Sequence, residues 1–597
     1  MNPTRKRCSA RVTRVLILLL FSGLGSFAAG EAAAQGQWTT LPYVMPINPI
    51  HMALMNNGQV LIVAGSGYDA ANSNYEAAVW DPRAGTIIRQ SVGWDMFCNG
   101  MVVLPDGRVF INGGNLKYNP WLGERRSAVY DPVTGQFTDL ENMAHGRWYP
   151  TVTMLGDGSV MTFSGLSEFG ATNRSVEIYR VGSGWSPEYD SSWVPPLYPW
   201  MHLLPDGNVF VSGSISQSWT FAPSTKTWSA MAPTNLGRTR RYGSSVLLPL
   251  SPADGYAPRV MIFGGGDPAT ATTEIIDLSA PAPQWQYGPA MSQPRIEMNA
   301  TILPSGRVLA LGGSGRDEDA ATAGLNAEVY DPATNTFSSA GANAFPRLYH
   351  SNALLLPDAT VALVGSNPTQ GVYEQHIEIY SPAYLFNADG SLATRPSVTG
   401  VAPTITYGGT FQVQTPEAAD IASVVLMRPG APTHAFDMDQ RLVRASYTVG
   451  NGVLNVTAPP NGNIAPPGYY MLFIVNSAGV PSIASFMQLT AAFSLSATPA
   501  SRTVLPGAGT SYTVTVSAEP GFTDTVGFSV SGLPSGAGAT FSPPSVNGSG
   551  ATTMSVSTSM MTPPGSYELT IAGNSGGIVQ RKIVTLVVGL PLPLGLR

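Results

Sequence analysis

The feature that most constrains the fold is a segment that recurs seven times between residues 38 and 386. Each copy has a short apolar stretch, a turn that resembles Pro-Asp-Gly, and a second apolar stretch that ends in glycine or a small residue. In most copies a third stretch follows and ends like Tyr-Asp-Pro. Short apolar stretches separated by Gly- and Pro-containing turns predict β-strands joined by hairpins.

The spacing of the copies identifies the kind of repeat. The turn glycines Gly58, Gly107, Gly158 and Gly207 lie about 50 residues apart, and Gly306 falls in the same series. A period near 50 residues with four short strands per unit is typical of the kelch repeat, which forms one blade of a β-propeller. A β-helix, the alternative, needs a much shorter repeat. We therefore expect a seven-bladed kelch-type β-propeller over residues 38–387.

Two further β-rich regions follow the repeats. Residues 396–490 contain short alternating strands such as FQVQTP, ASVVLMRPG and GYYMLFIVNSAG, which favour an immunoglobulin-like β-sandwich. Residues 493–590 are richer in Ser, Thr, Gly and Pro and hold neither His nor Cys, so we expect a second immunoglobulin-like module with an accessory role. The predicted fold class is all-β, in agreement with 64 Gly and 50 Pro and only 11% charged residues.

The N-terminus has the three parts of a secretory signal peptide. Basic residues precede an apolar run from Val15 to about Phe27, and the small residues 32–34 follow. We expect a cleaved signal over residues 1–34 and a secreted protein, extracellular or periplasmic. An uncleaved membrane anchor is the alternative, although the run is short for a spanning helix. The net charge of −6 argues against a nucleic-acid partner.

A register test places six side chains on one ring. The test counts back seven residues from the turn proline of each copy, or from its equivalent. In a propeller, equivalent positions of successive blades surround the central axis, and here they begin the strand expected to be innermost. The six positions are Cys98, Tyr149, Tyr198, Tyr242, Glu297 and His350. A structural core would need only apolar or small residues at these positions, so the ring predicts a functional site, with Tyr349 one step from it.

The residue types on this ring suggest a transition metal. Imidazole and phenolate are ligands suited to copper. A second nitrogen ligand is expected, and the chain has six histidines. His434 lies between two strands of the first predicted sandwich, in a loop that could reach the mouth of the propeller. Cys98 is the only cysteine after the expected signal, and an unpaired cysteine in a secreted protein indicates a reactive thiol or other covalent chemistry.

These residues stand in motifs that resemble the copper-radical oxidases of the galactose oxidase and glyoxal oxidase group. The motifs are Asp95-Met96-Phe97-Cys98, Arg147-Trp148-Tyr149-Pro150-Thr151, Arg347-Leu348-Tyr349-His350-Ser351, and Thr433-His434 followed by Asp439-Gln440-Arg441. The resemblance covers roughly residues 38–490. It implies one copper ion bound by Tyr149, His350 and His434, with Tyr349 as the axial ligand.

The resemblance also implies a thioether bond between Cys98 and the ring of Tyr149. The cross-linked ring would hold a radical beside copper, Tyr349 would act as general base, and O2 would be reduced to H2O2. The expected substrate is a small aldehyde or a primary alcohol, with the glyoxal oxidase-like branch favoured over a carbohydrate oxidase. A non-catalytic kelch adhesin that binds glycans is the alternative from another class. Peroxide-using enzymes or cell-wall glycans are conceivable partners, and we expect a monomer.

Some aromatic and acidic residues remain open from the sequence. Tyr198, Tyr242 and Glu297 either line the substrate pocket or fill the propeller channel as hydrogen-bonded plugs. The group has a tryptophan stacked on the cross-linked tyrosine, about 18 residues after it, and this chain has Ser167 there. Trp148 neighbours Tyr149 in sequence, so the two side chains should point in opposite directions. Phe169 or a tryptophan from elsewhere could shield the ring instead.

Overall fold

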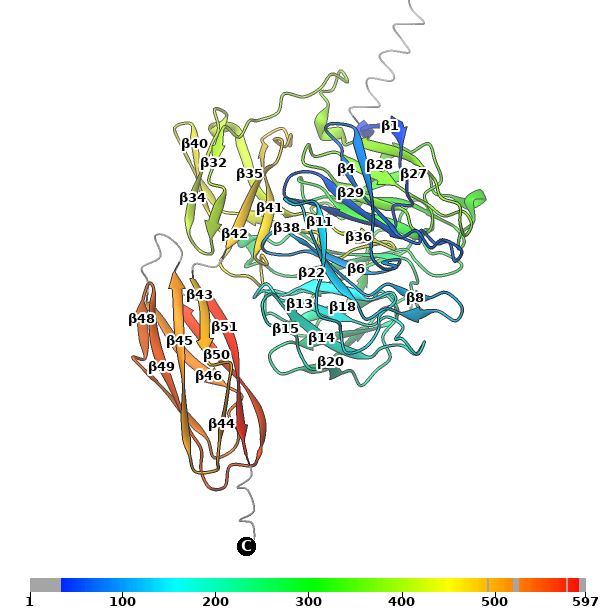
Figure 1. Ribbon diagram of the computed structural model, residues 1–597. Coiled ribbons are helices and arrows are strands. Elements are labelled where there is room, and N and C mark those ends of the chain that lie inside the picture. Colours follow the sequence, from blue (N-terminus) through cyan, green and yellow to red (C-terminus); the bar gives the residue numbers. More distant parts are fainter. Residues whose placement is uncertain (1–33, 491–492, 519–524, 576–577, 590–597) are drawn as a thin grey trace, which may run out of the picture.

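The protein is described by a computed structural model that covers residues 34–490, 493–518, 525–575 and 578–589. The expected signal peptide therefore lies almost wholly outside the described residues. Strands dominate the described part, and the predicted all-β class is confirmed (Figure 1). No helix in these ranges is long and apolar enough to cross a membrane.

Seven antiparallel sheets account for residues 37–381. Six of them are formed by consecutive segments of chain, and each first strand pairs with the second, the second with the third. Their strands are β2 His51–Leu54, β3 Val60–Gly65, β4 Glu76–Asp81, β5 Thr86–Ser91; β6 Gly100–Val103, β7 Val109–Asn112, β10 Ser127–Asp131, β11 Gln136–Asp139; β12 Thr151–Met154, β13 Val160–Phe163, β14 Ser175–Arg180, β15 Gly184–Trp185, β16 Tyr189–Asp190; β17 Trp200–Leu203, β18 Val209–Gly213, β19 Gln217–Ala222, β20 Thr227–Pro233; β21 Ser244–Leu247, β22 Arg259–Phe263, β23 Thr273–Asp277, β24 Trp285–Tyr287; β25 Ile296–Ile302, β26 Val308–Ser314, β27 Asn326–Asp331 and β28 Thr336–Ala342.

The last sheet closes the ring by pairing the two ends of this region. Its strands β29 Asn352–Leu355, β30 Val361–Val364 and β31 His376–Ser381 are joined by the N-terminal strand β1 Gln37–Val44, which pairs with β31. The first strands of the seven sheets contact one another in the closed order β2, β6, β12, β17, β21, β25, β29 and back to β2. These strands are buried along their whole length, whereas the fourth strands are largely exposed. The first strands therefore surround the axis, as the register test assumed.

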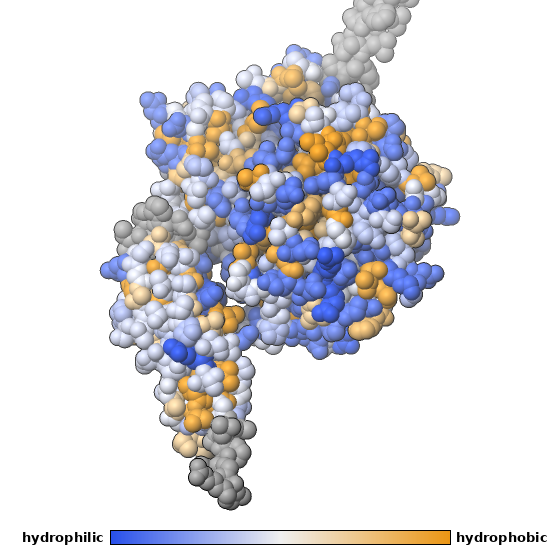
Figure 2. Space-filling model, viewed as in Figure 1, coloured by the Kyte–Doolittle hydropathy of each residue, from blue (hydrophilic) through white to orange (hydrophobic). Residues whose placement is uncertain are grey.

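Two sandwiches follow the propeller. The first has the sheets β32-β34-β40-β39 and β33-β42-β41-β35-β38, and the last module has β43-β45-β49-β47 and β44-β51-β50-β46-β48. Their strands are β32 Gly400–Val401, β33 Thr404–Thr406, β34 Thr410–Gln414, β35 Ile421–Arg428, β38 Arg441–Ala445, β39 Tyr447–Gly450, β40 Val453–Thr457, β41 Gly468–Asn476, β42 Ser485–Thr490; β43 Phe493–Thr498, β44 Ser501–Val504, β45 Gly509–Ala518, β46 Thr525–Ser531, β47 Gly538–Ser542, β48 Ser545–Asn547, β49 Gly550–Ser557, β50 Gly565–Ser575 and β51 Ile578–Val588. Hydrophobic and hydrophilic residues are interspersed over the face shown in Figure 2.

One hairpin leaves the first sandwich and enters the propeller. Its strands, β36 Pro432–Thr433 and β37 Phe436–Asp437, pair with each other and contact the inner strands β2, β29 and β25. His434 and Ala435 form the turn with φ of 47° and 71°. Positive φ at both central residues is the mark of a type I′ turn, which matches the twist of a tight hairpin. The hairpin brings a residue of the sandwich to the axis of the propeller.

Candidate metal centre

The six ring positions share an unusual backbone conformation. Each has a φ between 47° and 71°, in the left-handed region that non-glycine residues seldom adopt: Cys98, Tyr149, Tyr198, Tyr242, Glu297 and His350. Neighbouring ring residues are linked through the backbone, because the amide of Tyr149 donates to the carbonyl of Cys98 and the amide of Tyr198 to that of Tyr149. Strained backbone of this kind persists where the surrounding structure holds it in place, and it concentrates at functional sites.

Four of the sheets hold their ring residue with a buried ion pair. The pairs are Arg147–Glu177, Arg240–Glu274, Arg295–Glu328 and Arg347–Glu378. In the first three the ring residue follows its arginine by two positions, but His350 follows Arg347 by three. This one-residue insertion lets two consecutive side chains reach the axis, and the rings of Tyr349 and His350 lie 3.8 Å apart.

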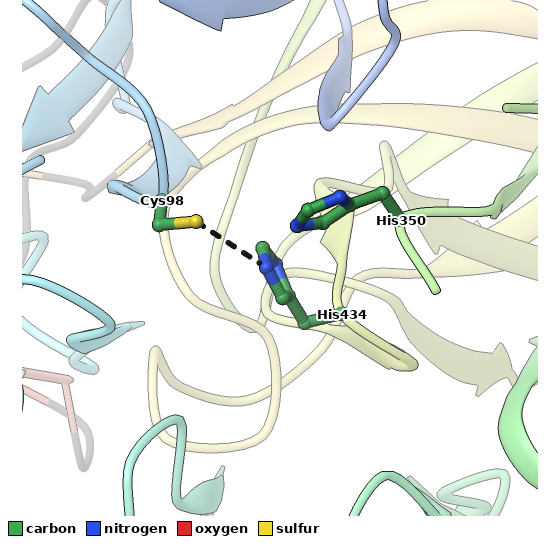
Figure 3. A group of neighbouring side chains, drawn as sticks. All are labelled: Cys98, His350 and His434. Atoms are coloured by element: carbon green, nitrogen blue, oxygen red, sulfur yellow. Dashed lines mark hydrogen bonds between the residues drawn. The ribbon is translucent and has the colours of Figure 1, made fainter. Parts of the chain in front are cut away.

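The metal-binding candidates converge on one buried point. The ligand atoms of Cys98, His350 and His434 all lie within 4.8 Å of one another (Figure 3). The ring of Tyr149 lies 4.7 Å from that of His434, and the ring of Tyr349 lies 5.3 Å from it on centroids. All five residues are at most 6% exposed. The structure thus brings together the five residues to which the sequence assigned the site.

Hydrogen bonds fix the tautomer of His350. Asn367 donates its Nδ2 to the carbonyl of Val372, which orients the amide and leaves Oδ1 as the acceptor for Nδ1 of His350 at 2.5 Å. Nδ1 therefore carries the proton, and Nε2 keeps its lone pair. That Nε2 is buried and has no hydrogen-bond partner in the described part of the chain. A buried lone pair held in this way is what a metal ligand requires.

The same reasoning applies to His434. Thr433 donates its hydroxyl to the carbonyl of Ile50 at 2.9 Å, so its oxygen accepts the proton on Nδ1 of His434 at 2.6 Å. Nε2 of His434 then presents a lone pair, 3.4 Å from Sγ of Cys98. Burial lowers the pKa of His350 to about 3, and burial with the charge of His350 lowers the pKa of His434 well below its usual value. Both rings are therefore neutral, the form that binds metals.

A third histidine lies nearby but does not offer a ligand. The ring centroid of His51 is 5.8 Å from that of His434, but Nε2 of His51 accepts the backbone N–H of Asn99 at 3.2 Å. Its available lone pair is thus already used. His145 and His376 pair with Glu168 and Glu374 at the surface, and His202 bonds Ser245.

The donor set fits copper. Two neutral imidazoles, two phenols and one sulfur, all on buried residues, surround one point, and nitrogen and phenolate donors suit copper in a tetragonal arrangement. Burial raises the pKa of Cys98 well above that of a free thiol, with a further contribution from the charge of Asp95. Burial also raises the pKa of Tyr349. These shifts favour neutral side chains while no cation is bound.

The remaining ring residues take different places. Tyr198 donates its hydroxyl to the carbonyl of Asn99 at 2.7 Å, and its ring lies 4.6 Å from that of Tyr149. Tyr242 is only partly buried, and its hydroxyl lies 3.5 Å from that of Tyr349. Glu297 is 3% exposed and its Oε1 finds no donor among the described residues.

Glu297 belongs to an acidic cluster beside Tyr242. Burial, together with a hydrogen bond to and the charge of Asp317, raises the pKa of Glu297 well above its usual value. Asp317 pairs with Arg241 at 3.0 Å, and the guanidinium of Arg241 lies 4.7 Å from the ring centroid of Tyr242. The amide of Glu318 donates to Oε2 of Glu297. The cluster therefore favours the protonated form of Glu297 beside Tyr242.

The sequence reasoning missed several neighbours of the site. The ring of Tyr68 lies 5.1 Å from that of His350 and 5.8 Å from that of Tyr349, and Asn367 orients His350. Both residues follow the glycine that ends the second strand of a repeat. In an antiparallel pair the end of the second strand lies beside the start of the first, so polar and aromatic residues just after that glycine were the available signal.

The structure also shows how Trp148 and Phe169 lie relative to the ring of Tyr149. The ring of Trp148 lies 4.0 Å from that of Tyr149, tilted by 59° rather than stacked. Phe169 is 78% exposed and contacts His145, so it does not cover the Tyr149 ring. Trp121, which the sequence did not single out, stacks on Trp148 at 4.3 Å and 12°.

Comparison with known proteins agrees with this site. The glyoxal oxidase N-terminus family matches residues 70–384, and the galactose oxidase-like early set domain matches residues 395–489. The aldehyde oxidase GLOX of Vitis pseudoreticulata is 32% identical over 445 residues, which are 66% of this chain and 82% of that protein. The chain belongs to the copper-radical oxidase family. A galactose oxidase of Gibberella zeae is 27% identical over 487 residues, 75% of this chain and 69% of that protein.

A solved structure supports the fold of this family member. A fungal alcohol oxidase in complex with copper matches with a TM-score of 0.66 at 24% identity and covers 76% of this chain and 99% of its own. At this identity the likeness concerns the fold. The family membership rests on the sequence matches, which span the propeller and the first sandwich.

Proposed function

We propose that the protein is a mononuclear copper-radical oxidase of the glyoxal oxidase-like branch, which oxidises small aldehydes with O2 and releases H2O2. The observation that carries the proposal is the convergence of Cys98, Tyr149, Tyr349, His350 and His434, with both Nε2 lone pairs directed to one buried point. Primary alcohols and carbohydrates are the alternative substrates within the same chemistry. The relatives named aldehyde oxidase and galactose oxidase support both alternatives.

Four side chains would hold the metal. His350 and His434 provide nitrogen, and the phenols of Tyr149 and Tyr349 provide oxygen. Copper, when bound, supplies a one-electron redox couple beside an oxidisable phenol. A thioether from Sγ of Cys98 to the Tyr149 ring would donate electron density and make that ring easier to oxidise. The burial of both residues excludes water from the radical.

The chain's own residues would divide the chemistry between them. Tyr349 takes the proton of the substrate hydroxyl, and its hydroxyl lies beside that of Tyr242, which can orient it. The oxidised Tyr149 ring abstracts a hydrogen atom from the carbon that bears this hydroxyl. An aldehyde hydrate becomes a carboxylic acid when it loses two electrons and two protons, and O2 takes up both to form H2O2.

A different metal site must be distinguished. A thiolate with two imidazoles also suits zinc, and Cys98, His350 and His434 could form such a site. The two phenols beside the histidines and the family membership favour the cross-linked copper centre instead. If the protein were instead a non-catalytic kelch adhesin, no thioether would form between Cys98 and Tyr149.

The decisive experiment follows the covalent bond. Forming the thioether removes two hydrogens, so aerobic loading with copper should lower the intact mass by about 2 Da, while Cys98→Ser keeps its mass. The loaded protein should lose its titratable thiol, yield a Cys98–Tyr149 cross-linked peptide, and produce H2O2 in a screen of aldehydes, alcohols and sugars. A loaded protein with a free Cys98 thiol and no H2O2 from any substrate would exclude the oxidase function.

We also propose how the enzyme is organised and where it acts. Residues 38–387 form the catalytic propeller, residues 396–490 supply His434, and residues 493–590 serve as an accessory module. The N-terminal pattern of residues 1–34 directs export, and the enzyme works as a monomer outside the cytoplasm. Peroxide-using enzymes and cell-wall glycans are the partners that its product and last module suit.

A further inference from the structure

A row of contacting aromatic rings leads from the centre towards the surface. The ring of Trp148 lies 4.0 Å from Tyr149, Trp121 stacks on Trp148 at 4.3 Å, and Tyr118 lies 4.5 Å from Trp121. Tyr149 and Trp148 are buried at 4% and 7% exposure, whereas Trp121 and Tyr118 are partly exposed. Two ring-to-ring steps therefore connect the buried phenol with the outer part of the molecule.

The backbone holds this row in place. Trp121 lies between strands β8 Asn115–Lys117 and β9 Leu122–Gly123, a hairpin that follows the second strand of its sheet. Trp148 exchanges two backbone hydrogen bonds with Leu166, of 2.8 and 2.7 Å. Gly123 packs against the same segment so closely that a Cβ would lie 1.9 Å from the carbonyl oxygen of Leu166. The stack of Trp121 on Trp148 is thus fixed by contacts between two loops.

Packing alone does not account for the residue types. Covering a buried ring requires only apolar volume, which leucine or phenylalanine provides. Tryptophan and tyrosine are the aromatic side chains that lose an electron most readily. The molecule contains another stacked pair, Trp193 and Trp219 at 4.9 Å and 1°, which contacts Phe163 and Trp228. That pair offers an internal comparison, because among the described residues none of its ring contacts is with a residue of the metal centre.

We propose that Trp148 and Trp121 form the path by which Tyr149 exchanges single electrons with oxidants at the protein surface. The proposal rests on the proposed function, because it concerns the cross-linked Tyr149. Tyr149, a phenolate in the proposed site, loses one electron and no proton, and no bond is made or broken. The electron passes through Trp148 and Trp121 and reduces a one-electron oxidant that cannot enter the pocket. The enzyme that lies one electron below its radical form, with Tyr149 not yet oxidised, is thereby brought to that form without turnover.

The test measures radical formation rather than activity. Copper-loaded, cross-linked protein is first brought to the state in which copper is oxidised and Tyr149 is not, so that the radical form lies one electron away. It is then mixed with ferricyanide in a stopped-flow instrument and followed by the absorbance of the radical, with its yield checked by electron paramagnetic resonance. Trp121→Phe and Trp121→Tyr form a matched pair, since they differ by one hydroxyl but only tyrosine is readily oxidised. Trp219→Phe controls for the loss of a stacked tryptophan elsewhere in the propeller.

The path predicts an order of rates. Trp121→Phe should slow radical formation at least about tenfold, which corresponds to ~1.4 kcal/mol in a barrier. The rates of radical formation in Trp121→Tyr and Trp219→Phe should stay within about threefold of the rate in the unaltered enzyme. The rate at which the formed radical decays is measured separately, because a residue that only shields the ring would change decay and not formation.

Four outcomes would overturn the electron path. Equal slowing by Trp121→Phe and Trp121→Tyr, or faster decay with unchanged formation, overturns the electron path and leaves the proposed function intact. Normal formation in all variants does the same. An unaltered protein that forms no thioether and no radical with ferricyanide refutes the proposed function itself, and the path with it.

Discussion

Replacing Asn367 with alanine tests whether His350 is a metal ligand held by its neighbour. The side chain of Asn367 makes three hydrogen bonds: Oδ1 accepts from Asn48 and His350, and Nδ2 donates to the carbonyl of Val372. Asn48 keeps a second acceptor, the carbonyl of Gly67 at 3.1 Å, and Val372 is 53% exposed and can be hydrated. The loss therefore concentrates on Nδ1 of His350, which is buried and left without an acceptor.

This loss sets the expected size of the effect. An unsatisfied buried donor costs about 1–3 kcal/mol. Removing the partner that orients a ligating histidine weakens metal binding about 10–100-fold, which is ~1.4–2.8 kcal/mol. We expect Asn367→Ala to weaken copper binding by that factor and to reduce the copper-induced rise in the melting temperature.

The assay must separate copper affinity from cross-linking. Copper is titrated anaerobically against a chelator of known affinity, so that the thioether does not form during the measurement. Asn343→Ala is the control, because Asn343 is also buried, at 3% exposure, but bonds the carbonyl of Phe345 away from His350. It should lower stability and leave copper affinity unchanged. Equal copper affinities for Asn367→Ala and the unaltered protein would refute the assigned role of His350.

Three further predictions concern the surroundings of the site. The raised pKa of Glu297 means that the folded state favours its protonated form, so the contribution of this group to stability is full below the unfolded pKa and is lost as pH rises towards the folded pKa. The free energy of unfolding of Glu297→Gln should therefore rise relative to that of the unaltered protein above pH 4.5, by at most ~1.4 kcal/mol per pH unit. Melting curves recorded across this range measure the difference, and parallel pH dependences would contradict it. Arg347→Met leaves Glu378 buried without its ion-pair partner, so the free energy of unfolding measured in urea should fall by about 3–5 kcal/mol. The double variant Arg347→Met with Glu378→Leu should recover most of this loss. Equal stability of the single and double variants would argue against the ion pair. Asp437 accepts hydrogen bonds from the backbone N–H groups of Ala431, Asp439 and Gln440. Asp437→Ala should therefore displace His434 and slow the copper-dependent loss of about 2 Da roughly tenfold, which is ~1.4 kcal/mol in a barrier, while Asp437→Asn keeps an acceptor and most of the rate. Equal rates for the two variants would contradict the anchoring role of Asp437.

The six ring positions could be predicted because the propeller sequence is a repeat. Because each copy has the same turn and the same alternation of side chains, counting from the turn proline identified six positions. All six have the same left-handed backbone in the structure, from Cys98 to His350. The register of a hairpin is fixed by its turn and its buried face, so a repeated pattern carries this information from one sheet to the next.

The neighbours of the ring were harder to predict, for a physical reason. Asn367, Tyr68 and Trp121 reach the site from loops whose lengths differ between copies, so no register relates them. The tilt of Trp148 against Tyr149 illustrates the same limit: alternation describes where side chains leave a strand, but here the chain before β12 is a bend held by Leu166. Such contacts depend on how two loops pack, which local sequence does not encode.

His434 needed the family resemblance, and the structure gives it a physical basis. The segment after the hairpin is bonded to three inner strands of the propeller: Asp439 accepts the amide of Val103, Gln440 that of Ile302, and Arg441 donates to the carbonyl of Leu203. Asp439 also pairs with Arg428 of the sandwich. The side chains of the Asp-Gln-Arg motif therefore bond the sandwich to the propeller, and the motif has no assigned role as a metal ligand.

This arrangement links metal binding to the assembly of two domains. Three of the four proposed ligands come from the propeller and one from the sandwich. A metal that binds only the docked form stabilises that form by RT ln(1 + L/Kd), where L is the free metal concentration. Positive φ at the ring residues costs of order 1–3 kcal/mol each, and persists where surrounding contacts determine it. The hairpin supplies such contacts, because β36 and β37 pack on β2, β25 and β29. The hairpin thus packs against strands that begin at the strained ring, which explains why His434, a proposed metal ligand, can lie on a turn and still be held at the buried centre.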